Sequence, residues 1–256
     1  ALQQLSGGRF RYGIGSGDSA LRNIGTRPAQ VDEIEAYVRA VQDLCAGREA
    51  FWGGSRFGVH WHAAPTPVWI AAEGPRTQEL AGRIADGVIL SNCLDPAMRE
   101  VAFSNIRRGC EAAGRRFEEL EIWFMCNLVP AASEAEGIDS VKAILAGTAN
   151  HVYRFHMEGK GLPEDVKPKL EEHERRYDSR HHASPATAAH NAALVDELDL
   201  VDFLAPLGTL AGPPERLVER LQEVAASGAR NLILSQFVED ELGFMRLLAD
   251  EILPAV

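Results

Sequence analysis

Three glycines at alternate positions, followed by an aspartate, form the first group of residues that could do chemistry. The run Gly13 to Asp18 has the sequence G-I-G-S-G-D and ends a stretch, Arg9 to Gly15, that predicts a strand and then a turn. Glycines let the backbone approach a ligand closely, and a carboxylate beside them can accept a proton. The spacing is G-x-G-x-G, not the dinucleotide fingerprint. The run therefore predicts a ligand loop with Asp18 as its acid or base, or a tight turn in which Asp18 or Ser19 caps a helix.

A second group leads from a buried strand into a helix. Val68 to Ala72 is continuously apolar, as strands of parallel sheets are, and Gly74-Pro75 then opens a helix. A helix N-terminus presents unpaired N–H groups and the positive end of its dipole, which suits a phosphate. The alternative is an ordinary strand-to-helix connection. The candidate phosphate contacts are Ala71, Ala72, Glu73, Gly74 and Pro75, with Arg76 adding a charge and Thr77 a hydroxyl.

Histidines and one further aspartate offer other chemistry. His60 and His62 would share one face of a strand, as metal ligands do in some barrel hydrolases, but no third ligand follows by spacing, so a surface hairpin or loop lining is favoured. Asp86 lies at the N-terminal end of a strand, whereas barrel active sites form at the C-terminal ends, which favours a structural turn. The remaining histidines are expected to be mostly solvated: His151, His156, His173, His181, His182 and His190.

The elements that must position these residues alternate between buried strands and amphipathic helices. Apolar residues at helical spacing predict a helix over Val31 to Cys45, and Asp95-Pro96 supplies the cap and first residue of another. Such alternation with short connections predicts a parallel sheet, open or closed. Between Ala131 and Pro206 the pattern breaks into polar helical fragments, which we interpret as an insertion over one end of the sheet. The five predicted core strands start near Arg9, Val68, Val88, Leu120 and Asn231.

Composition limits the class of protein and its partners. The 256 residues are 46% hydrophobic and 25% charged, which is ordinary for a globular protein and excludes a disordered chain. A formal charge of −11 opposes binding to nucleic acid or anionic lipid. The four cysteines are scattered without a C-x-x-C pair, which indicates small buried side chains in a reducing compartment and favours the cytoplasm. No stretch approaches the apolar length of a membrane span.

Three stretches together resemble the bacterial luciferase-like monooxygenase superfamily, and within it the branch that uses the deazaflavin F420 and includes methylenetetrahydromethanopterin reductase. They are G-R-F-R-Y-G-I-G-S-G-D-S from Gly8, the run from Pro65 to Leu90 with its A-A-E-G-P and L-A-G-R-I-A-D-G motifs, and G-T-L-A-G-P-P-E-R-L-V-E-R-L from Gly208. The resemblance covers nearly the whole chain outside residues 131–206. It implies a (β/α)8 TIM barrel whose flavin or deazaflavin lies at the C-terminal face of the strands.

The resemblance also implies roles for the two groups of residues. The turn matching Ala72 to Thr77 holds the cofactor phosphate in the family, and the glycine loop matching Gly15, Gly17 and their neighbours lies near the reacting ring. An acid at the position of Asp18 matches a catalytic carboxylate of F420 enzymes, with Ser16 as its hydrogen-bonding neighbour. Hydride transfer at the cofactor ring requires the protein to align ring and substrate and to supply a proton partner.

This sequence departs from the pattern of the family at two points, one of which concerns the substrate and the other the cofactor. Sugar-phosphate dehydrogenases of the family carry a lysine for the substrate phosphate where this sequence has Leu94, so a phosphorylated sugar is disfavoured. The family's third barrel strand, with its first cofactor contacts, has no counterpart here, which leaves FMN open beside F420. We favour F420 because Gly-Pro follows Ala-Ala in that branch. The alternative is an FMN-dependent monooxygenase that activates oxygen and has a flavin reductase as its partner. Family members commonly form homodimers.

Three hypotheses follow for function. The first is an F420- or FMN-dependent oxidoreductase acting on a small organic substrate. The second is a metal-dependent barrel hydrolase using His60 and His62, and the third is a non-catalytic flavin-binding family member.

Length complicates the barrel. A complete (β/α)8 barrel needs eight strands, whereas five are predicted here, and the resemblance begins at the fourth. At about 30 residues per βα unit, about 90 residues would precede Ala1. We therefore expect residues 1–256 to form a single luciferase-like barrel domain, N-terminally incomplete by its first three βα units, or an open half-barrel that needs a partner. Residues 131–206 would be a helical insertion before the last strand.

Overall fold

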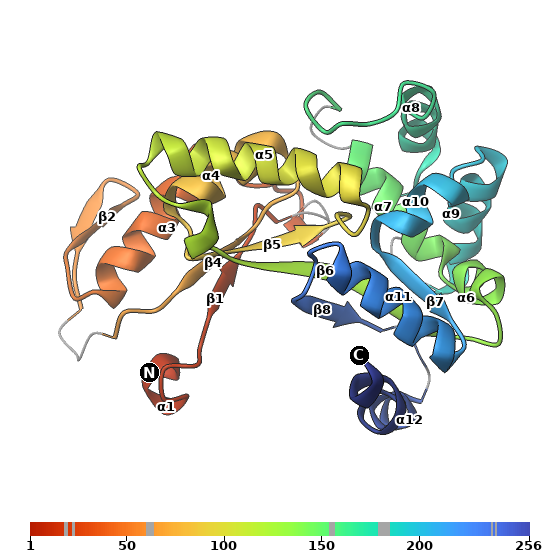
Figure 1. The fold of residues 1–256 in the computed structure, drawn as a ribbon. Helices are drawn as coiled ribbons and strands as arrows, with labels where there is room; N and C mark the ends of the chain where they lie inside the picture. Colours follow the sequence, from red (N-terminus) through yellow and green to blue (C-terminus); the bar gives the residue numbers. More distant parts are fainter. Residues whose placement is uncertain are drawn as a thin grey trace. The chain divides into compact units, whose positions relative to one another are not determined.

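The computed structural model describes residues 1–256 except 18–19, 22–23, 60–63, 154–156, 179–184, 237 and 239. The chain divides into two compact units, one of residues 1–89 with 102–122 and one of residues 90–101 with 123–256. Strand β5 (Gly87–Ser91), helix α5 (Pro96–Ala112) and strand β6 (Glu121–Pro130) pass from one unit into the other (Figure 1). Among the described residues, no helix combines the length and apolar character needed to span a bilayer.

The first unit is built on three parallel strands. Strand β1 (Tyr12–Ile14) pairs with β4 (Val68–Ala71), and β4 pairs with the first residues of β5, so that Ile14, Ile70 and Val88 lie in one row. The side chains of Val68, Ile70 and Val88 are fully buried, as expected for strands of a parallel sheet covered by helices. The remaining elements of this unit are α1 (Leu2–Leu5), α3 (Val31–Cys45), the antiparallel hairpin of β2 (Ala50–Trp52) and β3 (Ser55–Phe57), α4 (Pro75–Ile84) and η1 (Phe117–Glu119).

Asp86 has the structural role that its position predicts. Its carboxylate accepts a hydrogen bond from the Val68 N–H at 2.8 Å, and its own N–H donates to the Val68 carbonyl at 2.8 Å. The residue therefore ties the start of β5 to the start of β4, at the end of the strands opposite to the two candidate ligand loops.

The second unit is built on the rest of β6. This strand pairs in parallel with β7 (Thr209–Gly212) through Asn127 to Pro130 and with β8 (Leu232–Ser235) through Phe124 to Asn127. Helices α11 (Pro214–Ala226) and α12 (Glu241–Leu247), then η3 (Leu248–Ile252) and η4 (Leu253–Ala255), complete the C-terminal part.

Five helices fill the segment predicted to be an insertion: α6 (Glu134–Ser140), α7 (Lys142–Tyr153), α8 (Lys167–Arg176), α9 (Pro185–Glu197) and α10 (Val201–Gly208). The helices are confirmed, but the polar character of the sequence led us to expect no core in this segment, and that expectation is wrong. Leu145, Leu170, Val195 and Leu204 belong to a buried hydrophobic cluster of these helices. The polar residues that dominate the sequence lie around that cluster.

The strand count also needs correction. The described residues contain six parallel strands, not five, because β7 follows α10 directly. The helical segment therefore precedes the last two strands and not the last strand alone.

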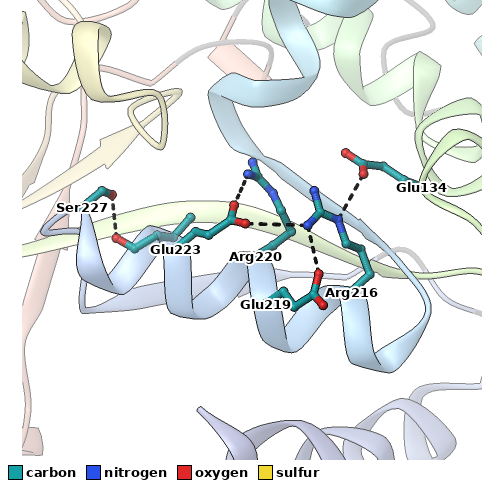
Figure 2. Close-up of polar contacts among 7 residues, drawn as sticks. Glu134, Arg216, Glu219, Arg220, Glu223 and Ser227 are labelled. Atoms are coloured by element: carbon teal, nitrogen blue, oxygen red, sulfur yellow. Dashed lines mark hydrogen bonds and ion pairs between the residues drawn. The ribbon is translucent and has the colours of Figure 1, made fainter.

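Ion pairs on the surface connect α6 to α11 (Figure 2). Arg216 contacts Glu134 of α6 at 3.4 Å and Glu219 of its own helix at 3.1 Å, and Arg220 contacts Glu223 at 2.5 Å. Exposed pairs of this kind contribute about 0–1 kcal/mol each, so the network adds little to the stability of the unit.

The cysteines behave as the composition predicts. Among the described residues they form no disulfide, and Cys93, Cys110 and Cys126 are buried. Burial raises the pKa of the Cys126 thiol to about 12, so this thiol stays protonated at neutral pH.

Candidate active site

The two candidate ligand loops lie side by side at the carboxyl ends of β1 and β4. Ile14, the last residue of β1, pairs with Ile70, so the residues that follow each strand are neighbours. A methyl group added to Gly15 would lie 3.4 Å from the Cβ of Ala71, which is ordinary contact with no spare room. The structure therefore brings the glycine loop together with the turn from Ala71 to Thr77, which we call the phosphate turn after the ligand expected there. In the sequence, 56 positions separate Gly15 from Ala71.

The backbone of the glycine loop requires one of its glycines. Gly17 has a φ of +75°, and a Cβ there would lie 2.5 Å from a methyl carbon of Leu21. The Ser16 hydroxyl donates to the Gly17 carbonyl at 3.4 Å, and the Ser16 carbonyl accepts from the Ala29 N–H at 2.8 Å. Ser16 is thus anchored through its backbone. Asp18, the predicted catalytic acid or base, lies outside the described residues.

The phosphate turn ends in a helix whose N-terminus carries no side-chain cap. Gly74 is the N-cap in an extended conformation, Pro75 follows at the first helical position, and no acidic side chain lies in the first turn. The first intrahelical bond runs from the Gln78 N–H to the Gly74 carbonyl. Earlier N–H groups have no partner within an α-helix, and a Cβ added to Gly74 would meet nothing within 4 Å. The turn can accept an anion against its backbone.

A chain of side-chain amides supports this turn from inside the unit. Buried Gln78 donates through Nε2 to the Glu73 carbonyl at 3.2 Å and accepts from Nδ2 of Asn105, on α5, at 2.7 Å. The Asn105 Oδ1 accepts in turn from Arg108 at 2.7 Å. Sequence reasoning missed these residues, because an isolated glutamine on a helix carries no motif. Together they hold the carbonyl that precedes Gly74 in place.

Replacing Gln78 by methionine is expected to raise the dissociation constant of a phosphate-bearing ligand at this turn by about three- to tenfold. The variant keeps the side-chain volume but loses the hydrogen bonds to the Glu73 carbonyl and from Asn105, of which the first holds the turn, and one such bond contributes about 0.5–1.5 kcal/mol. Ligand titration of both proteins measures the change.

Gln42, on α3, supplies a matched control because it binds the opposite end of α4. Its Nε2 donates to the Ile84 carbonyl at 2.8 Å, so Gln42→Met removes the same kind of bond far from the turn. Equal weakening by both variants would show that Gln78 acts on stability alone.

Arg76 lies in a more acidic setting than a phosphate contact would prefer. It lines a hollow of about 270 Å³ between α3 and α4 together with Val31, Asp32, Glu35, Glu79 and Arg83. Burial by itself would raise the pKa of Glu35, but the hydrogen bond from Arg39 and the charge of Arg83 outweigh burial and lower it. Carboxylates therefore share the space around Arg76. The backbone N–H groups at the start of α4 are better placed to bind an anion than the Arg76 guanidinium is.

The histidines divide between described and undescribed positions. His60 and His62, on which the metal-site hypothesis depends, lie outside the described residues, as do His156, His181 and His182. Within the part of the chain that the structure describes, no group of metal-ligating side chains comes together. His173 is an exception among histidines expected to be mostly solvated, since it is completely buried.

Parallel βα units define an α/β protein, and the two candidate loops lie at the carboxyl ends of adjacent strands, where proteins of this class commonly bind their ligands. The sequence profile of the luciferase-like monooxygenases matches residues 1–231, and the chain belongs to that family. The resemblance predicted from the sequence is thereby confirmed.

Three proteins illustrate what the chain is similar to. The 5,10-methylenetetrahydromethanopterin reductase of Archaeoglobus fulgidus is 25% identical over an alignment that covers 99% of this chain and 75% of the reductase. A solved F420-dependent secondary alcohol dehydrogenase, in complex with an F420-acetone adduct, matches with a TM-score of 0.69 at 14% identity. The match covers 100% of this chain and 72% of the dehydrogenase. The oxygenating constituent of the 3,6-diketocamphane monooxygenase of Pseudomonas putida, in complex with FMN, matches with a TM-score of 0.55 at 15% identity. The match covers 100% of this chain and 73% of the monooxygenase. At these identities the two solved structures show the fold alone.

Proposed function

We propose that this protein is an oxidoreductase that binds F420, or else FMN, and acts on a small organic substrate. The observation that carries the proposal is the pairing of an uncapped helix N-terminus at Gly74 with the glycine loop at Gly15, at the carboxyl ends of adjacent strands. Membership of the luciferase-like family supports it, as does a relative named as a 5,10-methylenetetrahydromethanopterin reductase.

The residues at this site fit the phosphate of either cofactor. Glycine at position 74 leaves the approach to the helix N-terminus open, and small side chains at Ala71 and Ala72 keep the turn narrow. The candidate contacts from Ala71 to Thr77 would hold the phosphate, while Gly15 and Gly17 would let a flat ring approach the backbone. When bound, the cofactor would supply a ring carbon that accepts or donates a hydride.

Asp18 is the proposed proton partner of this reaction. In the sequence it directly follows Gly17, four positions after the last residue of β1, and barrel enzymes take catalytic side chains from the segments that follow their strands. A carboxylate there can hold or release the proton that leaves or enters the substrate, and Ser16 would be its hydrogen-bonding neighbour. The other residues of the site bind and orient.

F420 is favoured over FMN on one sequence feature. Gly-Pro directly follows Ala71-Ala72-Glu73, as in the F420 branch of the family. The phosphate turn itself serves both cofactors, so the choice does not rest on the turn's geometry.

Titration of the purified chain with F420 and with FMN, followed by fluorescence quenching, tests the proposal. We expect binding at micromolar concentration, tighter for F420. Asp18→Asn should leave that affinity unchanged and lower turnover about 100-fold, because positioned acid–base groups typically contribute 10²- to 10⁴-fold. Failure of both cofactors to bind would contradict the proposal.

Asp43→Asn is the control for the charge change, because Asp43 pairs with Arg48 on the exposed side of α3. Turnover unaffected by Asp18→Asn would remove the role of Asp18 and favour a non-catalytic cofactor-binding protein.

A further inference from the structure

One face of the second unit's sheet carries polar side chains that the proposed cofactor site does not use. Along β6, the side chains of Phe124, Cys126 and Leu128 are at most 3% exposed. Side chains alternate between the faces of a strand, so Met125 and Asn127 lie on the opposite face, and Met125 is 38% exposed. On this second face Met125 is exposed and Asn127 is half-buried, whereas Val129 and the neighbouring Thr209 are buried.

Three strands place polar residues at the same level of that face. Asn127 pairs in register with Thr209, the first residue of β7, and with Ser235, the last residue of β8. Residues in register on parallel strands point to the same side of the sheet. The Asn127 Nδ2 donates to the Thr209 hydroxyl at 3.4 Å, which agrees with that arrangement. Ser91, the last residue of β5, adds a hydroxyl 3.7 Å from the sulfur of Met125. We call Ser91, Asn127, Thr209 and Ser235 the polar row.

The loop that follows Ser91 is held in a strained and fixed conformation. Asn92 has a φ of +57°, which is uncommon for a residue with a side chain and often marks functional sites. Buried Arg99 donates to the Leu94 carbonyl at 3.1 Å and to the Ser227 carbonyl at 2.7 Å. The Leu94 N–H also donates to the Leu207 carbonyl at 3.0 Å. The loop is therefore preorganised beside the row.

The chemistry of the row selects an uncharged ligand. Its members are three hydroxyls and one amide, which together donate and accept hydrogen bonds but carry no charge. Leu94 is 4% exposed, so the loop contributes no cation there. From these four residues an anionic substrate would gain no charge to compensate for its lost hydration, whereas an alcohol, carbonyl or amide oxygen would keep its hydrogen bonds.

We propose that the polar row binds the oxygen-bearing part of an uncharged substrate, with Asn127 as its central hydrogen-bonding residue. This inference rests on the proposed function, because it assigns a substrate class to that enzyme. Ser91 and Ser235 lie at the carboxyl ends of their strands, where barrel enzymes bind their substrates. Asn127 and Thr209 lie three residues before the carboxyl ends of β6 and β7, so the row extends from that end into the face of the sheet.

Paired neutral and anionic probes test the inference on the full chain with its cofactor. Cyclohexanone is compared with cyclohexanecarboxylate, and glucose with glucose 6-phosphate, and each dissociation constant is measured by ligand-observed NMR. We expect the neutral member of each pair to bind at least tenfold more tightly. Asn127→Leu should raise the dissociation constant for cyclohexanone about three- to tenfold, the effect of one lost hydrogen bond.

Two further variants separate binding from folding. Asn127→Asp keeps the side-chain shape but loses the amide donor, so it should weaken cyclohexanone binding as Asn127→Leu does. Gln222→Leu removes an amide that donates to the Ala255 carbonyl at 2.8 Å on exposed α11, and it should leave probe binding unchanged.

The outcomes distinguish this inference from the proposed function. Three results would overturn the inference alone, provided that the cofactor titration is normal. They are tighter binding of the anionic probes, no binding of a neutral probe, and unchanged probe affinity in both Asn127 variants. Failure of the unmodified chain to bind F420 and FMN would overturn the proposed function and, with it, the substrate assignment.

Discussion

Replacing Gly109 by alanine is expected to lower the free energy of unfolding by about 3 kcal/mol, at the upper end of what overpacking usually costs. A Cβ at this position would overlap the carbonyl oxygen of Glu79 on α4 and lie 2.8 Å from its carbonyl carbon. The obstacle is backbone, which cannot rotate away as a side chain can. Gly82 is the reciprocal contact, since its Cβ would overlap the Ile106 carbonyl oxygen and lie 2.9 Å from the Cys110 nitrogen. Gly82→Ala should therefore have a similar effect.

Denaturant unfolding measures this prediction, and Gly58→Ala is its control. Gly58 has only the side chain of Glu49 nearby, at 4.0 Å from the added Cβ, so alanine there should change stability by less than about 1 kcal/mol. Wild-type stability in the Gly82 and Gly109 variants would mean that α4 and α5 are not in backbone contact. Because Asn105 of α5 supports the phosphate turn through Gln78, separation of these helices should also weaken cofactor binding.

The elements that sequence reasoning found are those whose signal is local. The apolar run from Val68 to Ala72 and the Gly74-Pro75 pair identify a strand, a turn and a helix start within ten residues, and the structure confirms all three. Strand β7 was missed because its four residues, Thr209 to Gly212, lie between the C-terminus of α10 and two prolines. Glycine and proline there indicate a turn and conceal a short strand.

Features that depend on distant pairs could not be predicted. The contact between Gln78 and Asn105 joins residues 27 positions apart, and neither has a distinctive neighbour. The core of the helical segment was missed for a related reason. Its buried leucines and alanines are spread over α7 to α10 among many charged residues, so the average polarity of the segment hides the apolar faces that meet. The polar row likewise depends on strand register, which the sequence does not state.

Lowering the pH from 7 to 4 is expected to remove about 3 kcal/mol of stability through His173 alone. Its imidazole is completely buried and stacks on Tyr177 at a centroid distance of 5.3 Å, and neither ring nitrogen has a hydrogen-bond partner among the described residues. Burial, aided by the nearby charge of Arg176, lowers the pKa of His173 to about 4. In the unfolded chain a histidine titrates near about 6.5.

The direction of this pH effect follows from which state binds the proton. Between about pH 6.5 and 4 the unfolded chain holds a proton on His173 and the folded chain does not, so acid favours unfolding; above about pH 6.5 the contribution is fully present. Free energies of unfolding at pH 7, 5.5 and 4 should therefore fall more steeply for the unmodified chain than for His173→Phe, which cannot titrate. His190→Phe, at an exposed position of α9, should keep the steep dependence. Equal slopes for the unmodified chain and His173→Phe would show that His173 is protonated, or reached by water, in the folded protein.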